Sequence, residues 1–207
     1  MHISEGVLTP QVLVVGAAVA AAGTVVGLKK MDYDKIPKVA VLTAAFFVTS
    51  LIHVPIGPTS VHLTLNGLVG ILLGWAAFPA ILIGLLLQAL LFQFGGLTVL
   101  GVNAVNMGVP ALIVYFLFSH LVKKESTALT VVCSFLAGAV AVLLSILFTA
   151  FSLVFSGEEF TNIARIMVMA HIPVVVIEGV VSVFIVTLLK KVKPEILEFP
   201  HAVPENA

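Results

Sequence analysis

The sequence has few charged residues and a single cysteine. Only 10% of its 207 residues are charged, whereas a soluble domain carries about 25%. The formal net charge is +0, so no basic excess indicates binding to nucleic acid. Cys133 alone can form neither an internal disulfide nor a multi-cysteine metal site. With 60% hydrophobic residues and a mean hydropathy of +1.22, residues 1–207 are predicted to form one integral membrane domain.

Signatures of two enzyme classes are also missing. No glycine loop followed by Lys-Ser or Lys-Thr is present, so the chain is not expected to hydrolyse ATP itself. Intramembrane proteases use paired glutamates beside an arginine. Here Glu158 and Glu159 lie in a predicted loop, and their spacing from Arg165 is too long. We therefore expect a protein without enzymatic activity and without an organic cofactor.

Long apolar runs fill most of the chain. They are apolar all the way round a helix, without period-2 alternation, which favours membrane-spanning helices over a barrel. The third and fourth runs are short, so they form a tight hairpin or one of them is not a full span. The sequence thus predicts an all-α polytopic membrane protein with seven transmembrane helices, near residues 11–28, 38–53, 62–76, 79–94, 104–122, 127–155 and 165–190.

Lysines follow the first, fifth and seventh of these runs. With seven crossings they all face one side, which the positive-inside rule makes cytoplasmic. The opening residues, MHISEGVLTP, lack the basic start of a signal peptide. We expect a multi-pass protein in the lipid bilayer of the cell (inner) membrane, with the N-terminus outside and the C-terminus in the cytoplasm. The lysines concerned are Lys29, Lys30, Lys35, Lys38, Lys123, Lys124, Lys190, Lys191 and Lys193.

The first two residues can chelate a metal ion. The α-amine of Met1, the amide nitrogen of His2 and the imidazole Nδ1 of His2 close two adjacent chelate rings. These three nitrogens in a plane leave one position for a second histidine, and planar nitrogen coordination suits Ni(II) or Cu(II). The alternative is that the dipeptide carries no function, because every chain starts with methionine and some have histidine next.

The stretch HVPIGPTSVHLTLNG, residues 53–67, brings further polar side chains to the predicted external side. It contains His53, Ser60, His62 and Asn66. Its prolines and glycine prevent a regular helix and predict a bent loop. Non-helical backbone at membrane depth is tolerated around a protein-lined cavity. The alternative is an ordinary interfacial turn with histidines at the level of the lipid headgroups.

The stretch QALLFQFGGLTVLGVNAVNMGVP, residues 88–110, places four amides in apolar surroundings. Gly95, Gly96 and Gly101 are expected to break the helix there. Amides can orient metal-binding imidazoles from behind, or they can hydrogen-bond between helices. Either role fits any one of the four, which are Gln88, Gln93, Asn103 and Asn106.

Two more features involve single helix faces. His171 and Glu178 are seven residues apart in AHIPVVVIEG and share a face; Glu178 is the one acid predicted well inside a span. Such an acid must be paired or hydrogen-bonded, and a structural anchor is favoured over a metal ligand. In the first run, Ala18 and Ala22 form a small-residue face that another helix can approach closely, in this chain or in a partner.

Four ordered motifs resemble the CbiM/NikM family, the cobalt- and nickel-binding membrane subunits (S components) of energy-coupling-factor transporters. The opening is similar to that family's MHI-x-[DE]-G-[FYV]-L. The loop around His62 looks closer to the nickel branch than to the SCSHPTG of the cobalt branch. The motifs, which span nearly the whole chain, are MHISEGVL, TSVHLTLNGLVG, FGGLTVLGVNAVNMGVPA and HIPVVVIEG.

This resemblance implies a fold and a metal site. The fold is a six-helix S-component core plus one extra N-terminal helix, and residues 1–10 insert into the bundle from outside. The Met1 amine, the His2 amide and imidazole, and the His62 imidazole then bind Ni(II), or Co(II), in a plane as the transported substrate. Ser60, Asn66, Asn103, His171 and Glu178 are expected around these ligands. His53 matches no ligand position.

The resemblance also implies partners. These are a transmembrane coupling subunit (T component), two ATP-binding-cassette ATPases and a small accessory membrane subunit, with Ala18 and Ala22 as a candidate contact. An autonomous secondary metal permease remains the main alternative, although such proteins carry more acids inside their spans. A vitamin-binding subunit would need an aromatic-lined pocket, and one Trp and two Tyr supply few rings for it.

Overall fold

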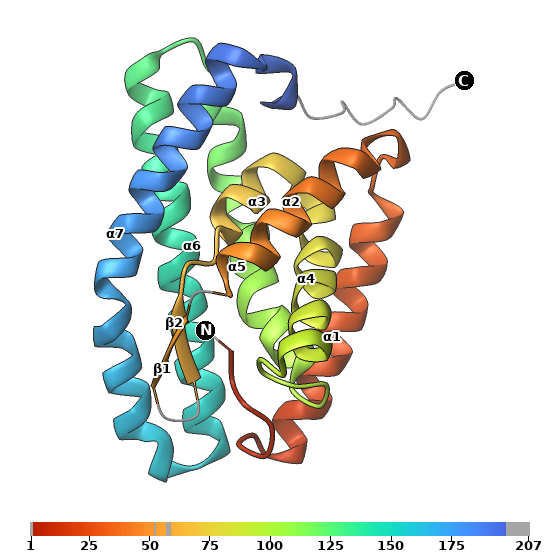
Figure 1. The fold of residues 1–207 in the computed structure, drawn as a ribbon, viewed down its shortest axis with the longest axis vertical. Helices are drawn as coiled ribbons and strands as arrows, with labels where there is room; N and C mark the ends of the chain where they lie inside the picture. The colour runs from red at the N-terminus through yellow and green to blue at the C-terminus, as the bar shows by residue number, and fades with distance from the viewer. Residues whose placement is uncertain (1, 52, 57–58, 198–207) are drawn as a thin grey trace.

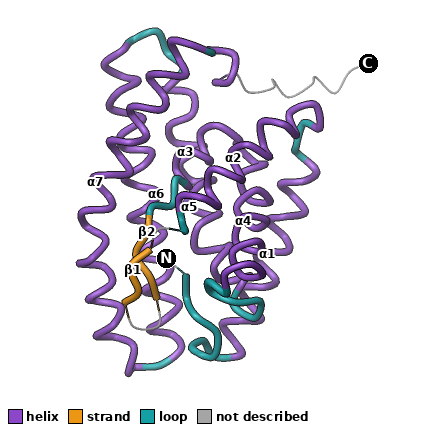
Figure 2. The backbone as a smooth tube through the Cα atoms, viewed as in Figure 1, coloured by secondary structure: helices purple, strands orange, loops and turns teal. Residues whose placement is uncertain are grey.

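The computed structural model describes residues 2–51, 53–56 and 59–197, and helices make up most of this part of the chain (Figures 1 and 2). Each apolar run predicted as a helix overlaps one of the described helices. The helices are α1 (Pro10–Lys29), α2 (Ile36–Thr49), α3 (Asn66–Leu73), α4 (Ala77–Phe92), α5 (Leu100–Val122), α6 (Thr127–Ser156) and α7 (Thr161–Val192). Strands β1 (His53–Ile56) and β2 (Thr59–His62) and short 3₁₀ turns η1 (Tyr33–Lys35), η2 (Gly74–Ala76), η3 (Glu158–Phe160) and η4 (Pro194–Leu197) complete the described elements.

Helix α1 packs through small residues on one face. A Cβ on Gly16 would lie 2.3 Å from a Val102 side-chain carbon, and one on Gly23 would lie 2.8 Å from the Phe78 ring. Glycine therefore lets the backbone of α1 approach α5 and α4 closely, as helices in membranes commonly do. The opposite face of α1, with Ala18 and Ala22, is exposed.

Helix α5 begins earlier than the sequence indicated. Gly95 and Gly96 lie between α4 and α5, where a break was predicted. Gly101, however, lies inside α5, so the prediction that it breaks the helix is wrong. A Cβ at this position would come within 2.7 Å of the Cα atom of Ala17. Close contact with α1, rather than a bend, accounts for the glycine.

The predicted bent loop after α2 is a β-hairpin. Strands β1 and β2 pair antiparallel, with His53 opposite His62. Helix α2 has 14 residues, too few to cross a bilayer by itself. In Figure 1 the hairpin continues from the end of α2, runs beside α6 and α7, and returns to the start of α3 near the middle of the bundle. The all-α expectation therefore needs this one correction.

The third and fourth apolar runs form two helices of unequal length. Helix α3 has eight residues and ends at Leu73. The next residue, Gly74, has a φ of 58°, which favours glycine. The chain turns through η2, and α4 then runs back past α3 toward the opposite end (Figure 1). The hairpin predicted for this region is thus observed, and α3 is not a full span on its own.

Five stretches of the described residues are long and apolar enough to cross a membrane. One stretch, Asn66–Phe92, comprises α3, η2 and α4, and the chain reverses direction within it. These stretches make the chain a multi-pass membrane protein, while the number of crossings depends on how α2, the hairpin and α3 are counted. The five are Pro10–Lys29, Asn66–Phe92, Leu100–Val122, Thr127–Ser156 and Glu158–Val192.

Lysines from distant parts of the chain meet at one end of the bundle. The Lys38 Nζ atom donates to the Ile196 carbonyl at 2.5 Å, and Lys190 Nζ donates to Thr130 Oγ1 at 2.6 Å. Lys30 lies over the Trp75 ring, 4.2 Å from its centroid. The α1–α2 and α5–α6 connections and the end of α7 share this end of the molecule in Figure 1.

Candidate metal site at the N-terminal segment

Residues 2–9 precede α1 and fold back into the bundle. His2 is 5% exposed and Ile3 is fully buried. The Ile3 amide donates to Asn103 Oδ1 at 3.0 Å, and the Asn103 side-chain amide donates to the Ile3 carbonyl at 3.2 Å. A buried backbone segment must find such partners, because no water is available to it. Asn103, on α5, therefore holds the segment at the depth of the histidine.

The α4–α5 loop contacts the same segment. The carboxylate of Glu5 accepts a hydrogen bond from the Thr98 backbone amide at 3.0 Å. Gly95 has a φ of +76°, and a Cβ there would lie 2.9 Å from the Asn103 Nδ2 atom and 3.6 Å from the His2 side chain. Glycine allows the loop both its left-handed turn and its close approach to these two residues.

Two imidazoles meet where the N-terminal segment reaches the hairpin. The rings of His2 and His62 stack with centroids 4.7 Å apart and an interplanar angle of 28°. His2 Nε2 lies 2.5 Å from Gln88 Oε1, and His62 Nδ1 lies 2.8 Å from the Leu63 carbonyl. Both acceptors are oxygens, so these nitrogens carry the protons. The tautomers that follow carry their lone pairs on His2 Nδ1 and His62 Nε2.

Burial keeps the His2 ring neutral. Removal from water lowers the pKa of His2 from 6.5 to about 3, because the charged imidazolium loses its hydration. A neutral imidazole is the form that binds a metal ion. The His2 ring therefore does not have to lose a proton at neutral pH before it can act as a ligand.

The stacked rings of His2 and His62 are not oriented to bind one metal ion together. A ring nitrogen donates its lone pair in the plane of the ring, so two stacked rings cannot both direct a lone pair at one ion. Binding requires one of the two rings to turn. Among the described residues, no group of three or more His, Cys, Asp or Glu side chains is arranged to hold a metal. Met1, predicted as a ligand, lies outside the described residues.

Glu178 fixes the backbone next to His62. Its carboxylate accepts hydrogen bonds from the Thr64 amide and hydroxyl and from the Leu65 amide, the last at 2.9 and 3.1 Å. Leu65 adopts a left-handed φ of 50°, which is costly for a residue with a side chain. The buried carboxylate on α7 therefore holds a strained turn that places the end of β2.

The other residues predicted around the metal ligands lie either beside His62 or in contacts between the surrounding helices. Ser60 is buried on the same face of β2 as His62. Asn66 donates to Ser145 Oγ at 2.8 Å and to the Met107 carbonyl at 3.1 Å, so it ties α3 to α6 and α5. His53 packs edge-on against the Phe94 ring, with centroids 4.2 Å apart.

Gln88 was recognised as an apolar-span amide but was not included in the predicted site. It accepts from His2 and donates to Ser50 Oγ and, at 3.5 Å, to the Phe47 carbonyl. Gln88 and Ser50 are both fully buried. The sequence shows Gln88 as a polar residue in an apolar run. Its pairing with His2, 86 positions away, could not be predicted, because it depends on how α4 packs beside the N-terminal segment.

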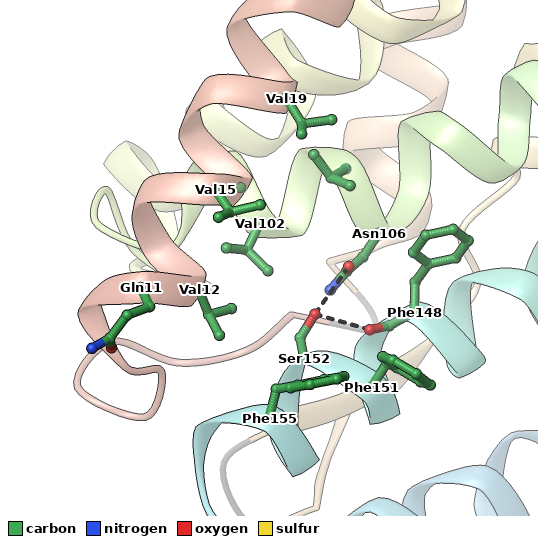
Figure 3. Close-up of a pocket in the computed structure, with 12 residues that line it drawn as sticks. Gln11, Val12, Val15, Val19, Val102, Asn106, Phe148, Phe151, Ser152 and Phe155 are labelled. Atoms are coloured by element: carbon green, nitrogen blue, oxygen red, sulfur yellow. Dashed lines mark hydrogen bonds between the residues drawn. The ribbon is translucent and has the colours of Figure 1, made fainter.

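A separate apolar hollow lies on the side of α1, between α1, α5 and α6 (Figure 3). Its volume is about 320 Å³. Valines and phenylalanines dominate its lining, and the Asn106 and Ser152 side chains, joined at 3.3 Å, are among its few polar groups. Neither imidazole of the candidate metal site lines it. The hollow therefore offers an apolar surface rather than metal ligands.

Comparison with known proteins now assigns the family. The family described as "Cobalt uptake substrate-specific transmembrane region", CbiM, matches residues 2–196. The chain belongs to the CbiM family. The description of this family is that of a membrane region for cobalt uptake, so the family is one of metal transporters rather than enzymes.

Individual relatives agree with this assignment. A "Putative metal transport protein" of Haemophilus influenzae is 43% identical over 199 residues, covering 95% of this chain and 97% of the relative. The "Fused nickel transport protein NikMN" of Rhodobacter capsulatus is 40% identical over 115 residues, which are 53% of this chain and 33% of that protein. A crystal structure of a transition metal transporter superposes with a TM-score of 0.73 at 29% identity, covering 93% of each chain.

Replacing Gln88 should weaken metal binding without unfolding the protein. Gln88→Leu removes the acceptor that keeps the His2 proton on Nε2, so Nδ1 is no longer favoured as the free donor. We expect the affinity for Ni(II) or Co(II) to fall about 10- to 100-fold, measured by calorimetric titration of purified protein. Gln11→Leu, at the exposed start of α1, is the control and should bind normally. Equal affinity of both variants would contradict this role of Gln88.

Replacing Glu178 should affect the fold more than the stoichiometry of metal. In Glu178→Gln one oxygen becomes a donor that faces the backbone amides of the Thr64–Leu65 turn. We expect a loss of stability of about 1–3 kcal/mol, seen as a lower melting temperature in detergent, with unchanged metal content in the folded protein. A well-folded variant without metal would instead make Glu178 a ligand.

Proposed function

We propose that this chain is the metal-capturing subunit of an ATP-driven nickel or cobalt uptake transporter. In this proposal Ni(II) is the preferred substrate and Co(II) an alternative one. The ion is held in a plane by the Met1 amine, the His2 amide nitrogen, His2 Nδ1 and His62 Nε2. Square-planar nitrogen coordination suits Ni(II) better than most divalent ions.

The hydrogen bonds of the two imidazoles carry this proposal. A chelate with the chain terminus requires Nδ1 of His2 to be free, and the Gln88 bond to Nε2 leaves it so. The planar site needs one more nitrogen donor, and the bond from His62 Nδ1 to the Leu63 carbonyl places the ring proton on Nδ1, so Nε2 is the nitrogen that carries the lone pair. Asn103 supports the site by holding Ile3 inside the bundle. Residues 1–10 then form a segment that inserts from the external side.

The proposed assembly includes a T component, two ATP-binding-cassette ATPases and a small accessory membrane subunit. The fused nickel transport protein of Rhodobacter capsulatus, in which the matching region is only 33% of the length, supports a multi-component transporter. Ala18 and Ala22 remain a proposed contact for one partner. An autonomous permease is disfavoured because Glu178, the acid inside a described span, is committed to backbone hydrogen bonds.

The chain path supports seven crossings, with two of them discontinuous. Helix α2 continues into β1 in one direction, and β2 continues into α3 in the other (Figure 1). Non-helical backbone is tolerated at membrane depth where neighbouring helices cover it; α7 contacts β2 here. Counted this way, the protein consists of a six-helix core plus α1, and its two ends lie on opposite sides of the membrane.

Blocking the chain terminus tests the metal site. One added N-terminal glycine converts the Met1 amine into an amide, which is a far poorer donor, so high-affinity Ni(II) binding should be lost. A glycine added at the C-terminus is the matched control and should have no effect. His2→Ala should weaken binding more than His62→Ala, because it opens the chelate, and His53→Ala should be mild. Bound Ni(II) should be diamagnetic. Native affinity in the N-terminally extended protein would refute the planar site.

Two exposed acids test the orientation. Glu125 lies in the α5–α6 connection at the lysine end, and Glu158 lies in the α6–α7 connection at the other end. With Cys133 replaced by serine, Glu158→Cys should react with a membrane-impermeant maleimide in intact cells, and Glu125→Cys should react only after lysis. The reverse pattern would place the lysine end outside, against the positive-inside rule.

A further inference from the structure

His171 has a nitrogen that the rest of the fold leaves unused. The side chain lies on α7 and is fully buried. Its Nδ1 atom lies 2.8 Å from the Met167 carbonyl one helical turn earlier, so Nδ1 carries the proton. The lone pair is left on Nε2, which has no hydrogen-bond partner among the described residues. A buried polar atom without a partner is uncommon in a native structure and calls for an explanation.

The fold places this nitrogen on the side of α7 that faces the metal site. His171 and Glu178 are seven residues apart, and side chains at this spacing share a face of the helix. Glu178 holds the backbone of Thr64 and Leu65, directly after β2. Helix α7 also contacts β2, the strand that ends at His62.

An ion in the proposed planar site would exchange its ligands slowly, and a nearby nitrogen such as His171 Nε2 would speed this exchange. A low-spin d⁸ ion in a plane of four nitrogens exchanges its ligands by first adding a fifth donor above the plane. In open solution water is that donor. The imidazoles of His2 and His62 are 5% and 3% exposed, so solvent has little access to the ion. A neutral nitrogen beside the plane can open the chelate instead.

We propose that His171 is a transit ligand, whose Nε2 binds the metal ion while it enters or leaves the chelate and shares it with His62. This rests on the planar site proposed above. On release, a bond from the ion to His171 Nε2 forms before the bond to the His2 amide nitrogen breaks. The amide nitrogen takes back from water, as the chelate opens, the proton that it released on binding. The ion remains divalent throughout, so the step needs no oxidant or reductant.

The test compares exchange rates with equilibrium affinity. The full chain with a free Met1 terminus is purified in detergent, loaded with Ni(II), and mixed with excess chelator. His171→Leu should retain the wild-type stoichiometry and nearly the wild-type dissociation constant, while release and uptake both slow by about tenfold or more. A purely structural role would lower affinity or stability and would not slow both directions equally. His120→Leu, an exposed histidine at the lysine end, is the control and should exchange at the wild-type rate.

Two outcomes would overturn the transit role. If folded, fully loaded His171→Leu releases and takes up nickel at the wild-type rates, His171 does not assist metal exchange. A folded variant without nickel would make His171 a ligand of the resting site instead. If His171→Leu does not fold, His171→Gln keeps a polar side chain without the imidazole and is judged by the same rates. The planar site itself is tested separately, by nickel binding to the N-terminally extended protein.

Discussion

The insertion of a polar chain end into an apolar bundle is the constraint on which the site depends. Backbone groups at this depth must be satisfied by protein, since water cannot reach them. Asn103 supplies both a donor and an acceptor to Ile3, and Glu5 reaches the Thr98 amide from the same segment. Without the bonds to Asn103, the amide and carbonyl of Ile3 would be buried unpaired, which costs free energy.

The second side of the site is held by a different kind of constraint. A hairpin and a left-handed residue, Leu65, lie where a continuous helix would otherwise pass. The Glu178 carboxylate collects the backbone amides that this irregular turn exposes. One buried acid on α7 thus fixes the end of β2, and with it the ring of His62. The lateral hollow beside α1 has no such polar framework and is lined mainly by apolar side chains.

Both imidazoles are oriented by groups behind them rather than by each other. Gln88 takes the proton of His2 on Nε2, and the Leu63 carbonyl takes that of His62 on Nδ1. Each ring therefore carries its lone pair on a defined nitrogen. His171 adds a third neutral nitrogen on the neighbouring helix.

Composition and motif order were enough to predict a multi-pass helical metal transporter of this family. The membrane class follows from the scarcity of charge, and the helices lie where the long apolar runs predicted them, because a buried helix satisfies its own backbone. Local sequence was less informative where tertiary contact decides the structure. Gly101 resembled a helix break, yet its position inside α5 reflects contact with α1.

The polar residues of the apolar spans can be read from the sequence, and each of them needs a compensating partner. Which partner each one finds depends on how the helices pack in three dimensions. Gln88 and Asn103 carry the same kind of amide, but one orients a ring and the other holds backbone. Glu178 meets a turn that lies 113 residues earlier. Hydrogen bonds depend on distance and direction in space, and linear spacing along the chain does not encode how separate helices pack.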